Sequence, residues 1–214
     1  MVSRSKDTVR EQSISARSAR SSAEISAAGI AIANHDWAAL CPGQLVTCFV
    51  SMATEPPTDR LRTKLRELGK EVALPIMKPG NSLAWGFDGT DLVKNSYGIF
   101  EPVPAEIDIT KAGAILIPAL RVGRDGSRLG RGAGYYDRAL ANVPTQATGG
   151  PIRICLVFDD EVDDFVPSEA HDAPIDLIRC SAFRFRGIGR IEIRRLAARP
   201  FEISKIVQGP FRPS

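Results

Sequence analysis

Hydrophobic residues are patterned along this chain in short runs and in helical repeats, and each pattern predicts a different element. Four short runs are rich in aliphatic and β-branched side chains, which is typical of strands. They are residues 44–52, 70–77, 112–120 and 152–159. The run at 112–120 is apolar at both alternating sets of positions, so we expect a strand buried on both faces. The segment SLAWGF at 82–87 predicts one further strand.

Helical spacing occurs between the first two strands. In residues 58–69 the side chains of Leu61, Leu65 and Leu68 recur on one helical face, and Gly69 follows as a C-terminal stop. A strand, a helix and a second strand within this distance form a βαβ unit, which implies parallel strands. The chain therefore predicts an α/β fold with three layers, in which helices flank a mostly parallel sheet.

Three more helices are predicted outside that unit. Residues 5–20 are polar with interspersed alanines, and a second helix begins at Ser21 or Ser22, because serine is a favoured N-cap residue. The third covers 135–143, after a glycine-rich loop that follows the strand at 112–120. This loop joins a central strand to a helix, which is where ligands bind in open α/β sheets.

Length and composition allow one domain with a substantial core, to which we assign Trp85 and Phe87. The chain has 214 residues, of which 43% are hydrophobic and 25% charged, and its net charge is +3. This charge alone does not indicate a nucleic-acid partner, and no apolar run approaches the roughly 20 residues of a membrane span. We therefore expect neither nucleic-acid binding nor membrane insertion.

The cysteines and the N-terminus bear on location. Cys41, Cys48, Cys155 and Cys180 show no CxxC spacing, so we interpret them as buried or incidental thiols in a reducing cytosol. Residues 1–24 are rich in serine and arginine as in a transit peptide, but they contain acidic side chains and no apolar signal core. A cytoplasmic protein with an exposed N-terminal helix is the expectation.

The loop GRDGSRLGRGAGYYDRAL carries the clearest chemistry in the sequence. Gly130, Gly132 and Gly134 alternate along it, so its backbone can approach a ligand without interference from a Cβ atom. Arg128 and Arg131 supply planar cations that match phosphate oxygens, and the helix that follows offers unpaired N–H groups. The alternative is a glycine-rich turn with solvated arginines, which the strand–loop–helix context disfavours.

The residues around this loop narrow the chemistry. Asp137 lies just inside the helix, where a carboxylate beside phosphates often holds Mg²⁺. The loop contains neither GxxxxGK[ST] nor GxGxxG, so neither a Walker A loop nor a dinucleotide site is indicated. The two histidines, His35 and His171, are too few for a zinc cluster or a Ser/His/Asp triad. The pattern favours a phosphate site with a metal ion.

The segment IPALRVGRDGSRLGRGAGYYDRAL strongly resembles the signature of the 5-formyltetrahydrofolate cyclo-ligases, also called methenyltetrahydrofolate synthetases. That signature is an apolar strand ending in proline, a short turn and then G-x-RLG-x-G-x-GYYD, and residues 126–137 match it throughout. The resemblance covers roughly residues 5–180 and implies an architecture like that of sugar isomerases and CoA transferases. It also implies that the loop holds the phosphates of ATP.

The resemblance extends to the N-terminal helix, where the family carries Lys-x-x-x-Arg. KDTVR supplies this pair, which on its own would be interpreted as a solvated helix face. The residues that the resemblance implies for ATP binding are Lys6, Arg10, Arg128, Leu129, Gly130, Arg131, Gly132, Ala133, Gly134, Tyr135 and Tyr136. Of these, Arg128, Arg131 and Tyr135 are expected to be catalytic.

The segment FVSMATEPPTD resembles the family's folate-binding stretch after the first strand. Its Glu55 is expected to contact the folate, with Val50 and Met52 lining the approach, and an ordinary loop acid is the alternative. Tyr97, in NSYGIFEP, is expected either at the pterin or as a half-buried ring of the core. The folate site is also expected to include four loop residues, Arg131, Gly132, Gly134 and Tyr135.

Two acidic residues are implied for the metal. Asp137 closes the loop signature, and VPSEAHDAPID, which resembles the family's second acidic motif, supplies Asp172. The resemblance therefore implies Mg²⁺ as cofactor, with ATP as co-substrate. Without the resemblance, Asp172 beside His171 would be interpreted as part of a surface loop.

Three features depart from the family pattern. Residues 176–180 are DLIRC where the family usually has Asp-x-(Ile/Val)-(Ile/Val)-Thr-Glu, Ala133 lies between the last two loop glycines, and an arginine-rich stretch follows. We therefore divide the chain into a catalytic domain, 1–183, and a basic C-terminal extension, 184–214. One strand is predicted within the extension, at 190–196.

The resemblance implies an ATP-dependent ligase that converts 5-formyltetrahydrofolate to 5,10-methenyltetrahydrofolate with release of ADP and phosphate. The formyl oxygen would attack the γ-phosphate, N10 would then attack the activated carbon, and phosphate would depart as the ring closes. Positioning and charge neutralisation account for most of the protein's part in such chemistry. The expected partners are a reduced folate and ATP, and the expected state is a monomer.

Three other functions stay open at this point. An enzyme that handles sugar phosphates or CoA is suggested by analogy of fold alone. A non-catalytic relative that binds folate or nucleotide would account for the altered DLIRC segment and the extension. A nucleic-acid-binding protein would use the arginines of the extension in a salt-dependent manner. The small net charge and the lack of an RNA-binding motif disfavour that reading.

Overall fold

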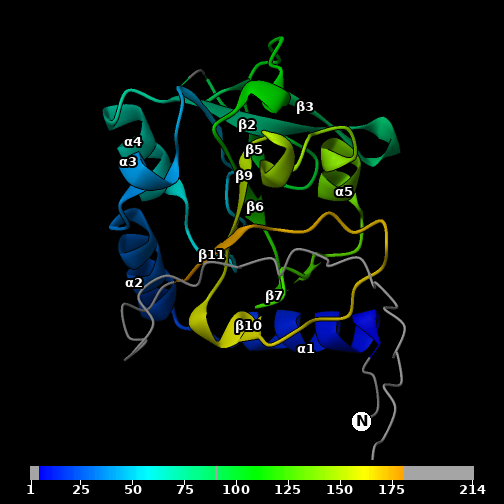
Figure 1. Ribbon diagram of the computed structural model, residues 1–214. Helices are drawn as coiled ribbons and strands as arrows, with labels where there is room; N and C mark the ends of the chain where they lie inside the picture. The colour runs from blue at the N-terminus through cyan, green and yellow to red at the C-terminus, as the bar shows by residue number, and fades with distance from the viewer. Residues whose placement is uncertain (1–4, 90, 181–214) are drawn as a thin grey trace, which may run out of the picture.

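The computed structural model of the chain describes residues 5–89 and 91–180 (Figure 1). The basic extension at 184–214, with the strand predicted at 190–196, lies outside the described residues. The described chain divides into a large central sheet, helices on both faces of that sheet, and two small accessory sheets.

The central sheet has six strands in the order β11-β9-β6-β1-β2-β3. Neighbouring strands are parallel except for β3, which runs antiparallel to β2 at one edge. The strands are β1 Leu45–Thr47, β2 Glu71–Lys78, β3 Ser82–Phe87, β6 Ala114–Pro118, β9 Ile152–Leu156 and β11 Leu177–Arg179. The predicted, mostly parallel sheet is confirmed.

Helices cover both faces of the sheet. They are α1 Lys6–Ser18, α2 Ser22–Ala33, α3 Trp37–Leu40, α4 Asp59–Glu67 and α5 Tyr135–Leu140. In Figure 1, α2, α3 and α4 lie on one side of the sheet and α5 on the other, while α1 lies at the end away from β2 and β3. The segment β1–α4–β2 forms the predicted βαβ unit, so the three-layer α/β fold is confirmed. None of the described helices is both long and apolar enough to cross a bilayer.

Short elements complete the fold. The accessory strands are β4 Val93–Lys94, β5 Phe100–Glu101, β7 Arg121–Gly123, β8 Arg128–Leu129 and β10 Val162–Asp163. β4 pairs with β5, while β7 pairs with both β8 and β10. The 3₁₀ helices are Pro79–Asn81, Ile109–Lys111, Gln146–Thr148 and Asp159–Glu161. The sheet β10-β7-β8 lies next to α1 (Figure 1).

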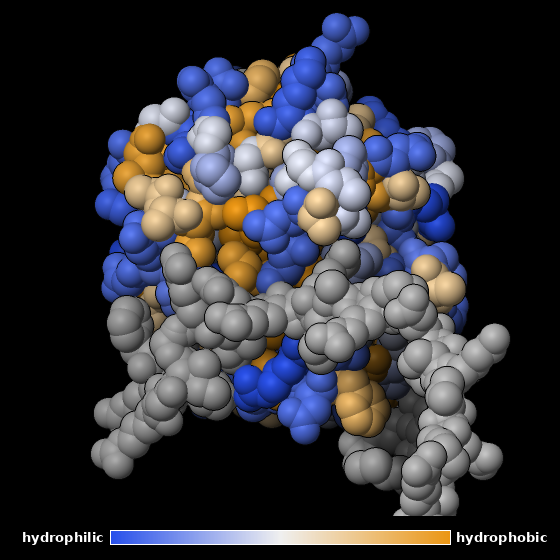
Figure 2. Space-filling view, in the orientation of Figure 1, coloured by the Kyte–Doolittle hydropathy of each residue, from blue (hydrophilic) through white to orange (hydrophobic). Residues whose placement is uncertain are grey.

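Alternate residues of the parallel strands enter two separate hydrophobic cores. Leu116 of β6 and Ile154 of β9 pack with α2, α3 and α4, whereas Ile115 and Cys155 pack with Leu140 of α5 on the other face. The predicted burial of the β6 strand on both faces is therefore confirmed. On the outer surface, hydrophilic residues cover the periphery, and the hydrophobic residues in view gather mainly toward the middle (Figure 2).

Local sequence signals set the helix ends. The Ser21 side chain accepts a hydrogen bond from the Glu24 N–H, and the Glu24 carboxylate accepts one from the Ser21 N–H at 2.8 Å. This reciprocal capping box starts α2 where the sequence predicts it. After the C-cap residue Leu68 of α4, Gly69 has a φ of +76°, which glycine adopts without steric cost.

Three predicted strands are shorter than their apolar runs, and the run at 152–159 is a strand only at Ile152–Leu156. The run at 44–52 is a strand only at Leu45–Thr47, and the run at 112–120 only at Ala114–Pro118, because the residues that follow leave the sheet to line a cavity. The single loop predicted after the run at 112–120 is instead the hairpin β7–β8 followed by the segment 130–134. Pairing with β10 holds this hairpin, and that pairing joins residues about forty positions apart.

Two further predictions need correction. The helix predicted at 135–143 ends at Leu140, shortly before Pro144, which has no N–H to continue a helix. Trp85 is buried as predicted, but Phe87 is 37% exposed rather than in the core. Phe87 is the last residue of the edge strand β3, so its ring is only partly covered.

Candidate active site

A cavity of about 790 Å³ lies at the carboxyl ends of β1, β2 and β6. Its wall includes Phe49 and Val50 after β1, Met77 near the end of β2, and Pro118 at the end of β6. In open α/β sheets ligands bind at this edge, because the parallel strands end there together. The volume is in the range of small-molecule sites.

Every residue that the sequence assigned to ATP, folate or metal lines this one cavity. They come from α1, from the loop after β1, from the turn between β4 and β5, from β8 through α5, and from the loop before β11. They are Lys6, Arg10, Val50, Met52, Glu55, Tyr97, Arg128, Leu129, Gly130, Arg131, Gly132, Ala133, Gly134, Tyr135, Tyr136, Asp137 and Asp172. The fold thus brings together segments that are distant in sequence.

The segment 130–134 exposes its backbone to the cavity. Gly132 and Gly134 have φ of +99° and +71°, a left-handed backbone that side chains with a Cβ rarely adopt. Within the described chain, the N–H groups of residues 130–135 have no hydrogen-bond partner. They are therefore available as donors to an anion. The helix α5 that follows has six residues, so the donors belong to the segment itself rather than to a long helix.

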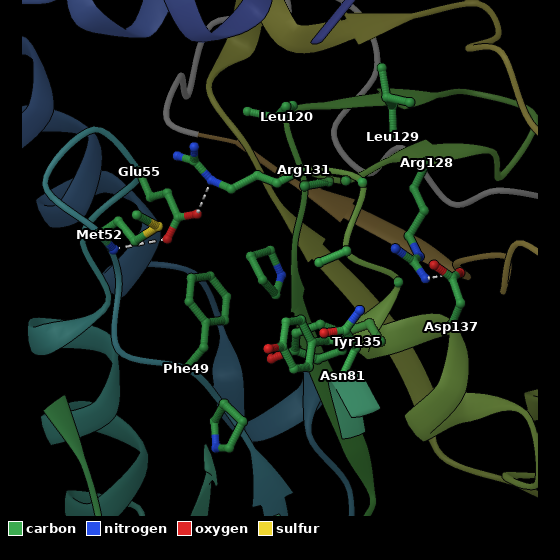
Figure 3. A pocket seen from close by; sticks show the side chains of 18 of the residues that line it. Phe49, Met52, Glu55, Asn81, Leu120, Arg128, Leu129, Arg131, Tyr135 and Asp137 are labelled. Atoms are coloured by element: carbon green, nitrogen blue, oxygen red, sulfur yellow. Dashed lines mark hydrogen bonds and ion pairs between the residues drawn. The ribbon is translucent and has the colours of Figure 1, made fainter. Parts of the chain in front are cut away.

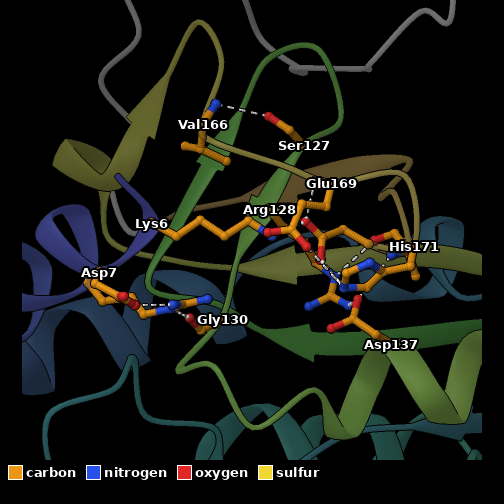
Figure 4. A network of polar contacts seen from close by, with 12 residues as sticks. Lys6, Asp7, Ser127, Arg128, Gly130, Asp137, Val166, Glu169 and His171 are labelled. Carbon is orange, nitrogen blue, oxygen red and sulfur yellow. Dashed lines mark hydrogen bonds and ion pairs between the residues drawn. The ribbon is translucent and has the colours of Figure 1, made fainter. Parts of the chain in front are cut away.

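Arg10 reaches across from α1 to this segment. Its Nε donates a hydrogen bond to the carbonyl of Gly130 at 3.1 Å (Figure 4). A Cβ atom at Gly132 would lie 3.4 Å from the Arg10 guanidinium. Asp7 pairs with the same guanidinium one turn earlier on the helix. The cation of Arg10 is therefore fixed against the glycine backbone.

Lys6 forms a charge cluster with the loop before β11. Its Nζ lies 2.7 Å from Asp172 and 3.0 Å from Glu169 (Figure 4). Burial disfavours the charged ammonium, but the hydrogen bonds and charges of the two acids outweigh it and raise the pKa of Lys6. Burial acts in the opposite sense on Asp172, yet Lys6 and the Glu169 N–H hold its pKa below the usual range. Both groups are therefore charged at neutral pH.

Arg128 and Asp137 form a second charge pair, 5% exposed at the arginine. The Arg128 Nη2 donates to Oδ1 of Asp137, and its Nε donates to the carbonyl of Ala173 at 3.0 Å. The Ala173 N–H donates to the same Asp137 oxygen at 3.0 Å. The guanidinium is therefore held in one orientation at the cavity wall (Figures 3 and 4).

The two acids expected at the metal each have an oxygen that no hydrogen bond uses. In Asp137 the contacts engage Oδ1, and in Asp172 the hydrogen bonds engage Oδ2. No group of three or more His, Cys, Asp or Glu residues in the described chain could hold a metal by itself. Mg²⁺ is usually bound by one or two carboxylates together with waters and substrate phosphates, so this donor set fits that ion.

Glu55 and Arg131 meet on the opposite wall (Figure 3). Glu55 is 7% exposed, and its Oε2 accepts the N–H of Met52 at 2.9 Å. Its Oε1 lies 3.6 Å from the Arg131 Nε, and Arg131 also reaches the hydroxyl of Thr54. A fixed carboxylate and a more exposed cation therefore face the cavity from the loop after β1 and from the glycine segment. An ordinary acidic residue of a loop is exposed to solvent, so the burial of Glu55 disfavours the interpretation of Glu55 as such a residue.

Tyr136 places a phenol inside this wall. Its hydroxyl is buried and has no hydrogen-bond partner among the described residues. Burial, followed by the proximity of Cys48 and Glu55, raises the pKa of Tyr136 well above its ordinary value. The phenol is therefore neutral and keeps a proton to donate.

The turn between β4 and β5 forms the rim of the cavity. The Asn95 side chain accepts the N–H of Tyr97 at 2.9 Å and donates to Glu101 at 2.8 Å. Glu101 also accepts the Met77 N–H at 2.8 Å, which ties the turn to β2. Tyr97 is 70% exposed and so is not the half-buried core ring that was one of its two expected positions. It lies on the rim and lines the cavity.

Sequence reasoning missed several cavity residues, among them Phe49, Asn81, Glu101 and Arg17. Phe49 belongs to a run predicted as strand, and Asn81 to a stretch without clear pattern, where it has a φ of +54°. Glu101 lies shortly after Tyr97 in the segment NSYGIFEP. This proximity in sequence could have indicated that Glu101 also lines the cavity. Arg17 lies on the same helical face as Lys6 and Arg10, a periodicity that could have indicated it.

A comparison with family models identifies the family of this chain. Residues 2–180 match the model described as the 5-formyltetrahydrofolate cyclo-ligase family. The chain is similar to the 5-formyltetrahydrofolate cyclo-ligase of Mycolicibacterium smegmatis, with 40% identity over 140 residues that cover 61% of this chain and 70% of the relative. It is also similar to the Escherichia coli protein of that name, with 30% identity over 143 residues, 62% of this chain and 75% of the relative.

Solved structures with the same fold are also found. One is the 5,10-methenyltetrahydrofolate synthetase of Mycoplasma pneumoniae, with a TM-score of 0.65 and 22% identity over 82% of this chain and 98% of the other. Another is the 5,10-methenyltetrahydrofolate synthetase of Aquifex aeolicus, with a TM-score of 0.67 and 22% identity over 82% of this chain and 89% of the other. At this level of identity the similarity concerns the fold.

Proposed function

Because the chain belongs to the 5-formyltetrahydrofolate cyclo-ligase family, we propose that its cavity converts 5-formyltetrahydrofolate to 5,10-methenyltetrahydrofolate with cleavage of ATP to ADP and phosphate. The observation that carries this proposal is the convergence of every predicted site residue on one cavity. One part of the wall offers cations and glycine backbone, and another offers a buried carboxylate and aromatic rings. A nucleotide and a folate would meet between them.

The phosphates of ATP would lie along the glycine segment. Its backbone N–H groups are available as donors, and Arg10 and Arg128 are fixed beside it by hydrogen bonds to the chain. Lys6 adds a charged ammonium from the first turn of α1. Phosphate oxygens pair well with such preorganised donors, because the protein need not reorganise them when charge develops during phosphoryl transfer.

The folate would occupy the part of the cavity near Glu55. A buried carboxylate held by the Met52 N–H can accept hydrogen bonds from the N–H groups of a pterin ring. Phe49, in the loop after β1, and Tyr97, in the turn between β4 and β5, offer aromatic ring surfaces to the cavity. Glu55 would thus set the orientation of the pterin and, through it, of the formyl group.

The reaction needs proximity more than a protein nucleophile. The formyl oxygen attacks the γ-phosphorus of ATP, ADP leaves, and the formyl carbon becomes an electrophile. N10 attacks that carbon and loses its proton, and phosphate leaves as the second C–N bond of the ring is completed. Arg128 and Arg131 stabilise the charge on the transferred phosphoryl oxygens, and holding both substrates in line supplies the remaining acceleration.

Asp137 and Asp172 would hold Mg²⁺ through the carboxylate oxygens that no hydrogen bond uses. When bound, Mg²⁺ neutralises charge on the phosphate oxygens and helps to align them. Arg128 pairs with Asp137 and Lys6 pairs with Asp172, so both acids are held in position beside the glycine segment.

Location, partners and boundaries complete the proposal. The protein would act in the cytoplasm, as a monomer, on a reduced folate and ATP, with residues 1–183 as the catalytic domain and 184–214 as a basic extension. All four cysteines are free thiols, which supports a reducing compartment. The family match ends at residue 180, which supports the boundary.

A direct assay tests the proposed activity. Purified protein is mixed with 5-formyltetrahydrofolate, ATP and Mg²⁺, and the near-ultraviolet absorbance of the methenyl product is followed. We expect the absorbance to grow only when ATP and Mg²⁺ are both present. Binding of ATP without any growth would contradict the catalytic proposal and would favour the non-catalytic relative.

A further inference from the structure

A buried ion pair attaches the C-terminal half of α1 to the rest of the fold. Arg17 is 1% exposed, and its Nε and Nη2 donate to Oε1 and Oε2 of Glu161, each at 2.7 Å. Nη2 also donates to the carbonyl of Ala119 at 2.5 Å, and Glu161 accepts the N–H of Phe158 at 2.9 Å. These contacts join α1 to the end of β6 and to the 3₁₀ helix Asp159–Glu161.

This arrangement is better suited to orienting α1 than to stabilising it. Burying two charges costs desolvation free energy, which their attraction offsets only when the geometry is good, and apolar residues of similar volume often stabilise equally well. A two-point contact between a guanidinium and a carboxylate, however, has a fixed direction. It specifies both the rotation of α1 and its position along its axis.

The cations of α1 share one helical face. At 100° per residue, Lys6, Arg10, Ser13 and Arg17 fall within about 60° of one another, and Arg17 lies about 16 Å from Lys6 along the axis. Lys6 and Arg10 line the nucleotide part of the cavity, and Arg17 lines its wall beside Ala119. A rotation of α1 that displaced Arg17 would therefore carry Lys6 and Arg10 away from the glycine segment.

The other buried contacts of α1 are not directional. The hydrophobic cluster that includes α1 consists of Val9, Leu129 and Val166, a small group of side chains. Contacts of this kind depend on the area buried and tolerate small rotations and shifts. Apart from the hydrogen bonds of Lys6 and Arg10 themselves, the ion pair is therefore the directional contact that orients the helix.

We propose that Arg17 and Glu161 are positioning residues for the nucleotide, which lock α1 in the one orientation that brings Lys6 and Arg10 to the phosphates of ATP. The inference rests on the proposed function, since it concerns the ATP site of the same cavity. Neither residue touches the reacting atoms. Their effect is transmitted through the rigid helix and is specific to ATP over folate.

The test compares Arg17→Met with the wild type by steady-state kinetics and by calorimetric titration with ATP. Methionine replaces the apolar stem of the arginine side chain but lacks its charge and its planar fork. We expect kcat/KM for ATP to fall by a factor of up to about 100, because misplaced groups are costly in catalysis. The KM for 5-formyltetrahydrofolate at saturating ATP should not change. An unchanged KM for ATP, or an equal rise in both KM values, would overturn the inference.

A second variant separates positioning from stability. Arg17→Met/Glu161→Met replaces the ion pair by two apolar side chains, so the melting temperature should return toward that of the wild type. We expect the weak ATP binding to persist, since the directional contact is still missing. Recovery of ATP binding together with stability would assign Arg17 a merely structural role and refute the proposal. This variant also keeps the test decisive if Arg17→Met alone fails to fold.

Coupling to the cations provides the sharpest control. If Arg17 acts through Lys6 and Arg10, then adding Arg17→Met to Lys6→Met/Arg10→Met should cause little further loss of ATP affinity. Additive losses would contradict the inference. Arg62→Met is the matched control, because the Arg62–Asp88 pair is also largely buried but lies away from α1, and ATP affinity should be unaffected. Failure of the proposed function can be told apart from failure of this inference. A wild-type protein without ATP-dependent turnover would refute the proposed function, whereas calorimetry measures ATP binding without turnover and would still test the role of Arg17.

Discussion

Single side chains in the cavity are oriented by contacts with the chain itself. Arg128 is held at one end by the Asp137 carboxylate and along its guanidinium by the Ala173 carbonyl. Glu55 is held by the Met52 N–H and lies near Arg131. Such preorganisation matters because a charged group that is already oriented loses little further freedom when it meets a ligand.

We predict that Arg128→Ala lowers kcat by a factor of about 10²–10³, the usual cost of removing one preorganised donor at a developing charge. Asp137→Ala should be similarly impaired, because it removes the partner of Arg128 and one of the two acids proposed for Mg²⁺. The methenyl absorbance assay measures the loss, and far-ultraviolet circular dichroism confirms the fold. Arg60→Ala, on the exposed face of α4, is the control. An unchanged rate in either variant would sink the assignment of this loop.

For Glu55→Gln we expect a fall in kcat/KM for 5-formyltetrahydrofolate of about 10-fold to 100-fold, in line with the loss of charged hydrogen bonds. The amide retains an oxygen that can accept the Met52 N–H, so the fold should persist. The KM for ATP should stay the same, and Glu67→Gln on the exposed face of α4 should behave as wild type. A rise in the KM for ATP alone would contradict this assignment, because it would show that Glu55 acts on the nucleotide rather than on the folate.

At the scale of elements, the cavity depends on where helices and strands begin and end. β1 and β6 stop early, and the residues after them line the cavity rather than extend the sheet. The capping box fixes the start of α2, which begins shortly after Arg17, the residue whose ion pair with Glu161 holds α1. Elements with well-defined ends therefore set the geometry of the loops between them.

The capping box makes a prediction about pH. The Ser21 hydroxyl, and then the Ser21 N–H, lower the pKa of Glu24. A lowered pKa in the folded state means that this contribution to stability is present above the usual glutamate range and is lost as the pH falls through the folded pKa. Carbon NMR of the Glu24 carboxyl should titrate below the ordinary value. Ser21→Ala should raise the titration midpoint of Glu24 toward its ordinary value. An unchanged midpoint in this variant would refute the capping box.

On the scale of the whole molecule, the sheet separates two cores. Cys48 faces the core under α2, α3 and α4, and Cys155 faces the core under α5. Each thiol is fully enclosed, so its reactivity reports on the opening of one face of the sheet. Cys41 is buried in the first of these cores as well.

We predict that these three thiols are nearly inert in the folded protein. Burial raises the pKa of Cys41, Cys48 and Cys155 to about 12 each. At pH 8 only about 10⁻⁴ of such a thiol is thiolate, the reactive form. Labelling by a disulfide reagent in the Cys180→Ser variant should therefore be slow under native conditions and complete after denaturation. Fast native labelling at any of the three positions would contradict the packing of that core.

The sequence by itself determined the features that depend on neighbouring residues. The βαβ unit, the capping of α2, the stop at Gly69 and the glycine segment were all predictable, because hydrophobic period, capping and glycine conformation are local properties. The loop signature also predicted Arg128 and Asp137 as site residues, since both lie within one short motif. The predicted site residues were scattered along the chain, and no local pattern contains the distances between them.

Only the tertiary structure decided which residues meet. The Arg17–Glu161 pair joins positions 144 apart, and the Lys6–Asp172 contact joins positions 166 apart. The rim is tied to β2 by the hydrogen bond from the Met77 N–H to Glu101. The β7–β8 hairpin likewise depends on pairing with β10. No local pattern encodes such contacts, because their free energy depends on the burial and geometry that appear only when distant segments pack together.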